Sequence, residues 1–405
     1  MPGQISAIVP TYNRSAFLDE ALCALESQQR PPSQIIEWDD GSTDGTPEVV
    51  PQRRAASPIP ILYRRSANGG KSRALNAALD ETTGDYIWIC DDDDISLPGA
   101  GRSLAQALET TGYGIAAGRH LRFRDASGTG ERIMDGTGYW PDLSEGSVLR
   151  HLLEDIFFFQ NATLVRRDLY DRVGGFREDL ARSIDYEMFV RLAARSPVAM
   201  VDDVMFHQRK HDGARGPSSA RHAAGSSETV WLENDRAIFA AFRALLPLSL
   251  YAAFFEGANA AAQHRAGLLE RGCVYARRRD WDAAREDFGD AAAMAHAGPI
   301  GPVERAILLR AMAGKHGADE ACEAPVSARL AELRQLGVSG REMAQALAHG
   351  AQWRLRAALT RRDAAEAARI ARVIWKTSRG RVGGAAPPPT GLSERRTLPA
   401  EAYRW

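Results

Sequence analysis

Residues 86–94 read YIWICDDDD, an unbroken apolar run that ends in four consecutive aspartates. A continuous run of this kind is typical of a strand in a parallel sheet that helices cover on both faces. Ligands of such sheets bind in the crevice beyond the carboxyl ends of the strands. Four like charges at that place repel one another unless a cation lies among them, and hard divalent cations prefer oxygen ligands. Taken alone, the run is more simply explained as a solvated acidic loop. The other motifs of the chain are therefore needed to choose between an acidic loop and a metal site.

The bulk composition is that of an ordinary globular protein. Charged residues make up 25% and apolar residues 44% of the 405 residues, and the formal net charge is −1. This length suffices for roughly two or three domains with proper cores, and nothing in the charge balance points to a nucleic-acid partner. The four cysteines are scattered without a CxxC pair, which predicts a reducing compartment and neither a disulfide framework nor a zinc site.

The ends and apolar runs predict a cytoplasmic location. The N-terminal MPGQISAIVP lacks the charged-then-apolar layout of a signal peptide. No apolar run approaches the ~18 residues that span a bilayer. The nearest, residues 244–255 (ALLPLSLYAAFF), carries Pro247 and predicts a buried helix. It leaves open a peripheral membrane contact at the inner face of the membrane, which would matter for a lipid substrate.

Strand and helix patterns alternate through residues 5–90. Four apolar segments have the length of strands: 5–9, 34–38, 59–63 and 86–90. Helical patterns begin between them at Ser15, Thr46 and Lys71, and the first has apolar residues at helical spacing behind a serine cap. Such alternation implies right-handed βαβ units, so we expect an α/β fold with a mostly parallel central sheet flanked by helices.

The pattern changes towards the end of this first domain. Residues 112–140 are Gly-rich and predict shorter strands, and helices are expected at 168–173 and 185–194. We place the end of the domain at residue 215, so that it comprises residues 1–215.

The second half of the chain predicts an all-α domain. Residues 216–228 are rich in Gly, Ser and Ala and predict a linker. Residues 229–378 are rich in Ala, Arg, Leu and Glu, and two stretches in them weakly resemble tetratricopeptide hairpins without a sustained repeat. Residues 379–405 are Pro/Gly-rich, and we expect this tail to be disordered.

Polar residues follow three of the four predicted strands. Pro10–Asn13 follows the first, Asp39–Ser42 the second and Asp91–Asp94 the fourth, and Asp185 begins a later helix. Each segment alone has a structural interpretation as a turn, an Asx turn before a helix or a solvated loop. Because the ends of parallel strands meet at one edge, these carboxylates could instead face a base, a ribose or a metal.

Several motifs occur in order along the chain: IVPTYNR (8–14), IIEWDDGSTDGT (35–46), NGGKSRALNAAL (68–79), GDYIWICDDDDISLP (84–98), GGFREDLARSIDYEMFVRLA (174–193) and RKHDG (209–213). Their order and spacing resemble the inverting glycosyltransferases of family 2, over about residues 4–215. The resemblance implies a GT-A fold, followed here by the all-α domain. It also implies transfer of a sugar from a nucleoside-diphosphate sugar to a hydroxyl acceptor.

The resemblance assigns roles around the nucleotide. The residues that correspond to the family's base-binding positions are Pro10, Thr11, Tyr12 and Asp40. Asp92 is expected to reach the ribose or the donor sugar. Lys71 is expected to contact phosphate, and a solvent-exposed lysine at a helix start is an equally good interpretation.

The resemblance also assigns the metal and the general base. Asp91 and Asp93 correspond to the family's metal-binding motif, with Asp93 as the direct ligand, and His211 can complete a Mg²⁺ or Mn²⁺ site. Without the resemblance, His211 reads as a surface histidine. Asp185 corresponds to the catalytic base, while isoleucine at position 184 replaces the family's preceding glutamate and leaves the orientation of the base open.

These residue types suit one displacement reaction. A metal among the aspartates stabilises the charge of the diphosphate leaving group, and a carboxylate removes the proton of the attacking hydroxyl. The expected partners are a UDP-, GDP- or TDP-sugar and a sugar, lipid-linked or small-molecule acceptor, as in polysaccharide biosynthesis. The sequence leaves open whether the helical domain binds a protein partner. The alternatives are a non-catalytic binding protein on the same scaffold and, less favoured because PTYNRS lacks glycine, a nucleotidyltransferase.

Overall fold

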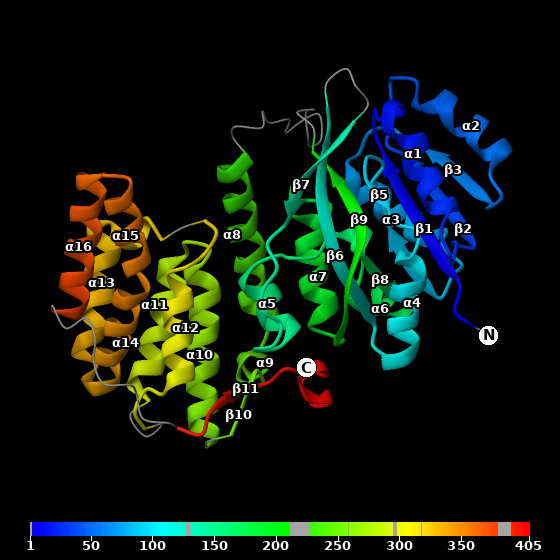
Figure 1. Cartoon of the computed structure of the whole chain (residues 1–405). Helices are drawn as coiled ribbons and strands as arrows, with labels where there is room; N and C mark the ends of the chain where they lie inside the picture. The colour runs from blue at the N-terminus through cyan, green and yellow to red at the C-terminus, as the bar shows by residue number, and fades with distance from the viewer. Residues whose placement is uncertain are drawn as a thin grey trace. The chain divides into compact units, whose positions relative to one another are not determined.

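The computed structural model describes residues 2–126, 131–210, 227–257, 259–294, 298–316, 318–379 and 390–405. They form two compact units (Figure 1). Unit 1 comprises Met1–Pro141 and Ile156–Asn234, and unit 2 comprises Asp142–Asp155 and Asp235–Trp405. The predicted linker lies almost wholly outside the described residues, so the predicted boundaries of the domains and linker stay predictions.

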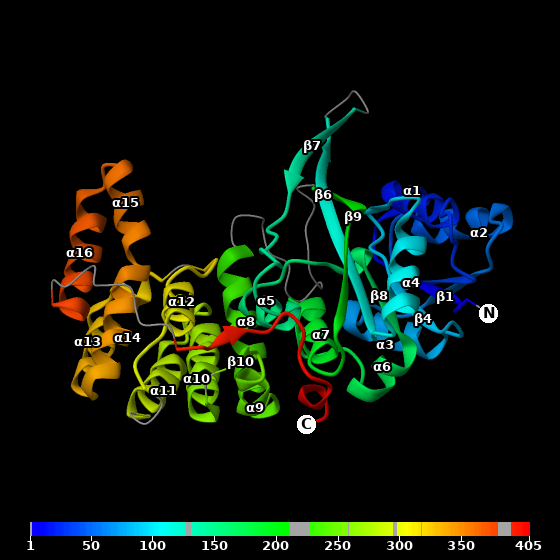
Figure 2. The ribbon, with the colours of Figure 1, turned by 60° about the horizontal axis from the view of Figure 1, so that its bottom comes forward.

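Unit 1 is built on one sheet of nine strands: β1 (Ile5–Thr11), β2 (Gln34–Asp39), β3 (Ile61–Arg65), β4 (Tyr86–Ile89), β5 (Ile95–Ser96), β6 (Ile115–Asp125), β7 (Arg132–Thr137), β8 (Thr163–Arg166) and β9 (Val198–Arg209). Their order is β3-β2-β1-β4-β8-β6-β9-β5, and β7 pairs with β6. Strands β1 to β4, β6 and β9 run the same way, and β5, β7 and β8 run against them. Figure 2 shows the long strands β6 and β9 side by side.

Helices connect the strands of unit 1: α1 (Ser15–Glu26), α2 (Thr46–Ala56), α3 (Lys71–Asp80), α4 (Ala100–Thr111), α6 (Arg167–Val173) and α7 (Ile184–Ala193), with the 3₁₀ turn η1 (Gln160–Ala162). The apolar face of α1 is buried, as its spacing predicts, through Leu18, Leu22 and Leu25. All four residues of β4 are buried because the sheet is covered on both faces. The predicted α/β fold of GT-A type, with its mostly parallel sheet, is confirmed.

Unit 2 is mainly helical, which confirms the predicted all-α class. Its helices are α5 (Val148–Glu154), α8 (Ser227–Leu245, which begins in unit 1), α9 (Leu248–Ala252), α10 (Ala260–Ala276), α11 (Trp281–Ala293), α12 (Pro302–Ala311), α13 (Ala324–Glu332), α14 (Gly337–Gly350), α15 (Gln352–Thr360) and α16 (Ala364–Ser378). Short 3₁₀ turns are η5 (Glu320–Cys322), η6 (Leu333–Gln335) and η7 (Ala400–Tyr403). The sequence did not predict the small ribbon in which β10 (Phe255–Glu256) pairs with β11 (Ser393–Glu394).

The chain end differs from the expected disorder where the structure describes it. Residues 390–405 contribute β11 and η7, and Leu392 and Leu398 are buried. The backbone pairing with β10 and these two apolar anchors supply the order that the Pro/Gly-rich composition does not predict.

The apolar stretch at 244–255 is largely buried, as its sequence predicts, although Leu245 is 44% exposed. Leu250, Tyr251 and Phe254 are almost fully buried, so these side chains do not offer the shallow membrane contact that the sequence left open. Within the described ranges, no helix combines the length and apolarity that a bilayer crossing requires.

Candidate active site

The carboxyl ends of β1, β2 and β4 meet at one edge of the sheet. β1 pairs in parallel with both neighbours, so that Thr11 lies opposite Asp39 and Ile8 opposite Ile89. The aspartate loop, Asp91–Asp94, begins just after β4. The fold therefore brings the three polar segments that follow these strands to the same edge, as a parallel sheet requires.

The aspartate loop is tied to a strand at each end. Thr11 Oγ1 donates a hydrogen bond of 2.7 Å to Asp92 Oδ2. The backbone N–H of Arg209 donates to Asp94 Oδ1 at 2.8 Å, and its Nε donates to the carbonyl oxygen of Asp93 at 2.9 Å. Both Asp92 and Asp94 are buried. These bonds fix the shape of the loop between β1 and β9.

Arg14 and Lys210 face the aspartate loop, and the pKa values of two of its carboxyl groups stay raised. Arg14 Nε lies 3.8 Å from Asp92 Oδ1 and 3.6 Å from Asp93 Oδ2, beyond ordinary hydrogen-bond distance. Burial and the charge of Asp93 raise the pKa of Asp92 to about 7. Burial likewise raises the pKa of Asp94 well above its usual range. Carboxyl groups that resist ionisation indicate a shortage of positive charge, and this all-oxygen set fits a hard divalent cation.

Lys71 connects the aspartate loop to Asp185. It is the first residue of α3, and its ammonium group forms an ion pair with Asp91 Oδ1. Burial alone would lower the pKa of Lys71, but the charges of Asp91, Asp185 and Asp92 outweigh burial and raise this pKa. Lys71 is therefore a cation in the field of three carboxylates from two distant segments.

Asp185 lies in the first turn of α7. Its Oδ1 accepts a hydrogen bond of 2.9 Å from the backbone N–H of Tyr186. Burial raises the pKa of Asp185, and the charge of Lys71 and this N–H offset only part of the rise. A carboxylate with a raised pKa is better suited to take up a proton than an exposed one. The electrostatics are thus those expected of a general base.

Asp40 is largely engaged by the protein itself. Its Oδ1 accepts from the N–H of Gly69 at 2.7 Å, and its Oδ2 accepts from the N–H of Gly70 at 2.8 Å and from Asn68 Nδ2 at 3.1 Å. A carboxylate offers about four acceptor positions, so these bonds leave about one for a nucleotide base. Asp40 also holds the turn that begins α3 and so positions Lys71.

The neighbouring Asp39 has a structural role. Its Oδ1 accepts from the N–H of Ser42 at 2.7 Å, which closes the turn after β2, and its Oδ2 accepts from Tyr63 Oη at 2.8 Å. Arg65 Nε lies 3.4 Å from the same Oδ2. Because Asp39 is fully buried under these partners, it cannot reach a ligand.

The segment that follows β1 is locked onto the turn after β2. The N–H of Thr43 donates to Asn13 Oδ1 at 2.7 Å, and the N–H of Asn13 donates to Ser42 Oγ at 2.9 Å. Pro10 is buried in β1 opposite Trp38 of β2, and Tyr12 is half-buried. The segment predicted to bind the base is therefore a turn fixed by hydrogen bonds, and its base-binding role stays a prediction.

Sequence reasoning missed one contact and leaves one prediction outside the described residues. Asn161, in η1, accepts the N–H of Asp91 through its Oδ1, while its backbone carbonyl accepts from Trp88 Nε1 at 2.9 Å. The signal was available, because Gln160 and Asn161 interrupt the apolar run at 156–165. His211, the predicted third metal ligand, lies outside the described residues.

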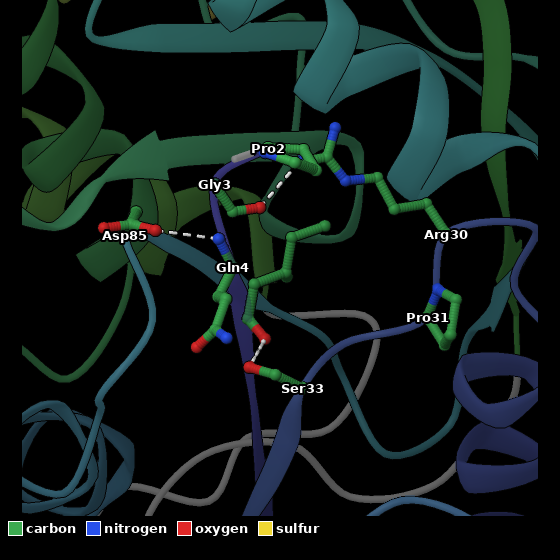
Figure 3. Close-up of a pocket in the computed structure, with 8 residues that line it drawn as sticks. Pro2, Gly3, Gln4, Arg30, Pro31, Ser33 and Asp85 are labelled. Atoms are coloured by element: carbon green, nitrogen blue, oxygen red, sulfur yellow. Dashed lines mark hydrogen bonds between the residues drawn. The ribbon is translucent and has the colours of Figure 1, made fainter.

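An open pocket of about 560 Å³ lies at the other end of the strands (Figure 3). Its lining includes Gln4, Ser33 and Asp85, which precede β1, β2 and β4, and Asp85 Oδ2 accepts from the N–H of Gln4 at 2.8 Å. None of the residues predicted for the site lines this pocket. It is therefore separate from the aspartate loop.

The segment that carries this geometry matches a known family. Residues 6–174 match the model of glycosyl transferase family 2. These residues form a family 2 glycosyltransferase domain. The match runs from β1 to the end of α6 and includes the aspartate loop. The predicted family and the predicted enzyme class are thereby confirmed.

Two similar curated proteins are also named as glycosyltransferases. The chain is 28% identical over 195 residues to the uncharacterised glycosyltransferase YwdF of Bacillus subtilis, covering 47% of this chain and 68% of the relative. It is 33% identical over 119 residues to a GalNAc(5)-diNAcBac-PP-undecaprenol beta-1,3-glucosyltransferase of Campylobacter jejuni, covering 29% of this chain and 38% of that protein.

Solved structures include similar chains at low sequence identity. TarS 1–349 of S. aureus in complex with UDP-GlcNAc has a TM-score of 0.49 and 17% identity, covering 85% of this chain and 90% of that one. The mannosyltransferase PcManGT of Pyrobaculum calidifontis, in complex with GDP-Man and Mn²⁺, has a TM-score of 0.45 and 20% identity, with 85% of each chain covered.

Proposed function

We propose that this glycosyltransferase is metal-dependent and inverting, and that it transfers a sugar from a nucleoside-diphosphate sugar to a hydroxyl acceptor with Asp185 as the general base. The observation that carries the proposal is the electrostatic link from the aspartate loop through Lys71 to Asp185. It joins the aspartates proposed to bind the cation to a carboxylate with a raised pKa, and these are the two groups that a single displacement needs.

Asp93 and Asp91 are the residues that would hold a divalent cation. Bound there, Mg²⁺ or Mn²⁺ would stabilise the negative charge of the diphosphate leaving group. Lys71 is paired with Asp91 in the described structure, and its ammonium would add a second positive charge beside the phosphates. Asp92, anchored by Thr11, would accept a hydrogen bond from the ribose or the donor sugar.

Asp185 would remove the proton of the attacking hydroxyl group. Attack from the face opposite the leaving group inverts the anomeric centre in one step. The isoleucine at position 184 leaves the side chain of Asp185 without the family's adjacent glutamate, but the N–H of Tyr186 holds one carboxylate oxygen in place. The other oxygen would face the acceptor, and proton removal by such a group is typically worth about 10²–10⁴-fold in rate.

The Campylobacter relative's name supports a lipid-linked sugar as one acceptor class. That protein is named for a glucosyl transfer to an undecaprenyl-diphosphate-linked glycan. For this chain, the acceptor classes to test are therefore lipid-linked sugars, free sugars and small molecules.

A test measures the release of nucleoside diphosphate from UDP-, GDP- and TDP-sugars, with Mn²⁺ or with EDTA, for the wild type and two variants. Asp93→Asn should lose metal-dependent turnover by about a thousandfold, since several kcal/mol of charge stabilisation are removed. Asp185→Asn should keep metal and nucleotide binding but lower kcat by about 10²–10⁴-fold.

The matched control is Asp171→Asn, which changes an exposed aspartate of α6 in the same way. It should turn over donor at the wild-type rate. Turnover that persists in EDTA, or that survives in Asp185→Asn, would contradict the proposed mechanism. Nucleotide binding without turnover of any donor would favour the alternative, a binding protein on a glycosyltransferase scaffold.

A further inference from the structure

The last two helices of unit 2 form a hairpin with two exposed faces. Both views show α15 and α16 as neighbours, and they pack against each other (Figures 1 and 2). In α15 the residues at 353, 356 and 359 are exposed, three positions apart. In α16 the residues at 368, 372 and 375 are exposed, three or four positions apart, and Arg379 follows the helix end. Such spacing places each set on one face of its helix.

Large apolar side chains stand on these faces. Trp353 is 49%, Leu359 60% and Trp375 66% exposed. The opposite face of α16 is packed normally, because Ile370 and Val373 are buried. The inner face of the hairpin therefore packs against the protein, while its outer side leaves apolar side chains exposed to water. Exposed apolar patches usually mark an interaction site.

The same faces are strongly basic. Residues 352–379, which we call the basic hairpin, contain eight Lys and Arg residues and two acidic residues, a net charge of +6 in a chain whose net charge is −1. Two of the arginines are neutralised, Arg354 by Asp319 at 2.7 Å and Arg361 by Glu366 at 2.6 Å.

Five further cations of the basic hairpin are exposed and form no ion pair with any residue that the structure describes: Arg356, Arg362, Arg372, Lys376 and Arg379. Three of them, Arg356, Arg372 and Lys376, are close in sequence to the exposed tryptophans. Apolar and basic side chains thus alternate along the same two faces.

We propose that the basic hairpin is a docking surface for an anionic phospholipid membrane. Tryptophan and leucine insert at the boundary between headgroups and acyl chains, while lysine and arginine contact anionic headgroups. Binding to single-stranded nucleic acid would use the cations and the tryptophans, but it gives no role to Leu359, the exposed aliphatic side chain of the same hairpin. The surface goes beyond glycosyl transfer, and its binding is measured without any donor.

Co-sedimentation of the full-length protein with vesicles tests the proposal. Phosphatidylcholine vesicles that contain phosphatidylglycerol should bind the protein, and vesicles of phosphatidylcholine alone should bind it much more weakly. Each of the substitutions Arg356→Gln, Arg372→Gln and Lys376→Gln should weaken binding about fivefold. Raising the salt concentration from about 0.1 M to about 1 M should weaken binding of the wild type more than any single substitution does, since it screens all the cations together.

The apolar part has its own variants and matched controls. Trp353→Ser combined with Trp375→Ser should lower binding at every salt concentration. Trp231→Ser, at another exposed tryptophan, and Arg285→Gln with Arg341→Gln, at exposed arginines of α11 and α14, should leave vesicle binding unchanged. Circular dichroism melts check that each variant folds.

Two results would overturn the proposal. One is binding to anionic vesicles that is equal in the hairpin variants and the controls. The other is binding of the wild type to short single-stranded DNA but not to anionic vesicles, with loss of DNA binding in the hairpin variants. Because neither experiment uses a donor, a failure here is distinguishable from a failure of the glycosyltransferase mechanism.

Discussion

Each unit of the molecule contains a group of buried carboxylates, and the two groups are neutralised differently. In unit 1 the aspartate loop pairs with Lys71 at one end, has Arg14 at 3.6–3.8 Å, and has Asp94 in the field of Lys210. In unit 2, Glu154, Glu270 and Glu394 form a glutamate cluster around Arg310. Arg310 lies 2.7 Å from Glu154, 2.8 Å from Glu270 and 3.0 Å from Glu394.

The pKa values show a difference and also a likeness. In unit 1, burial and the charge of Asp93 raise the pKa of Asp92 to about 7. In unit 2, Arg310, Arg277 and Arg150 lower the pKa of Glu154 despite its burial, while burial and the charge of Glu154 raise the pKa of Glu270 to about 8. Glu154, Glu270 and Cys273 lie close enough together to suggest a metal site, yet arginine already supplies the cation. The proposed metal site is therefore assigned to the aspartate loop from its place at the ends of the parallel strands and from its ion pairs, not from the pKa values alone.

The largest effect on stability is expected from Arg310→Ala. Removing the shared cation leaves Glu154 and Glu270 buried without their main partner, which should lower the free energy of unfolding by about 3–5 kcal/mol. Urea denaturation measures it. Arg285→Ala, at an exposed arginine, should stay within about 0.5 kcal/mol of the wild type. A loss of similar size in both variants would mean that the glutamate cluster is not held by Arg310.

A gain in stability is expected from Glu37→Met in unit 1. Glu37 is fully buried in β2, and neither of its carboxylate oxygens has a hydrogen-bond partner among the described residues. A methionine of similar shape removes two unsatisfied acceptors, which should raise the free energy of unfolding by about 1–3 kcal/mol.

The gain from Glu37→Met should depend on pH with a definite sign. Burial, with the charges of Asp39 and Asp92, raises the pKa of Glu37 well above the unfolded value of about 4.3. The native state therefore binds this proton more tightly, so the stability that Glu37 contributes is present below about pH 4.3 and is lost as the pH rises towards the native pKa. Melts at pH 5 and pH 8 should show the larger gain at pH 8, and a larger gain at pH 5 would refute the assignment.

Effects no larger than that of Glu37→Met are expected at two glycines near Asp40. Gly41 has φ +80°, and an added Cβ would lie 2.9 Å from the N of Asn68, so Gly41→Ala should cost about 1–3 kcal/mol. Gly70 has φ +91° and ψ 157°, a region essentially restricted to glycine, but nothing lies within 4 Å of an added Cβ, so Gly70→Ala should cost about 1–3 kcal/mol from backbone strain alone, less than Gly41→Ala with its added clash. Thermal melts rank the two variants. The reverse order would mean that the turn after β2 is not held as tightly as its contacts indicate.

Much of unit 1 follows from its sequence because its signals are local. The apolar runs give β1 to β4, and the rule that ligands sit beyond the ends of parallel strands gives the position of the aspartate loop. The contacts that shape the loop are not local. Thr11, Asn161 and Arg209 reach it from segments 70 to 116 residues away along the chain, and no periodicity encodes such pairings.

Unit 2 was predictable only as a class. Helical spacing and composition give its helices, but Glu154, Glu270 and Glu394 come from three distant segments and meet only in the folded chain. The order of residues 390–405 was missed for the same reason, since β11 depends on a partner strand more than a hundred residues earlier. A Pro/Gly-rich composition alone does not predict that a segment will pair with a distant strand.

The central claim is that the aspartate loop needs an external cation and the glutamate cluster does not. Calorimetric titration of Mn²⁺ in the presence of UDP, GDP or TDP tests it on the wild type, Asp93→Asn and Glu270→Gln. The account predicts Mn²⁺ binding that is supported by one nucleotide, abolished by Asp93→Asn and unchanged by Glu270→Gln. Mn²⁺ binding that survives Asp93→Asn, or that disappears in Glu270→Gln, would contradict it.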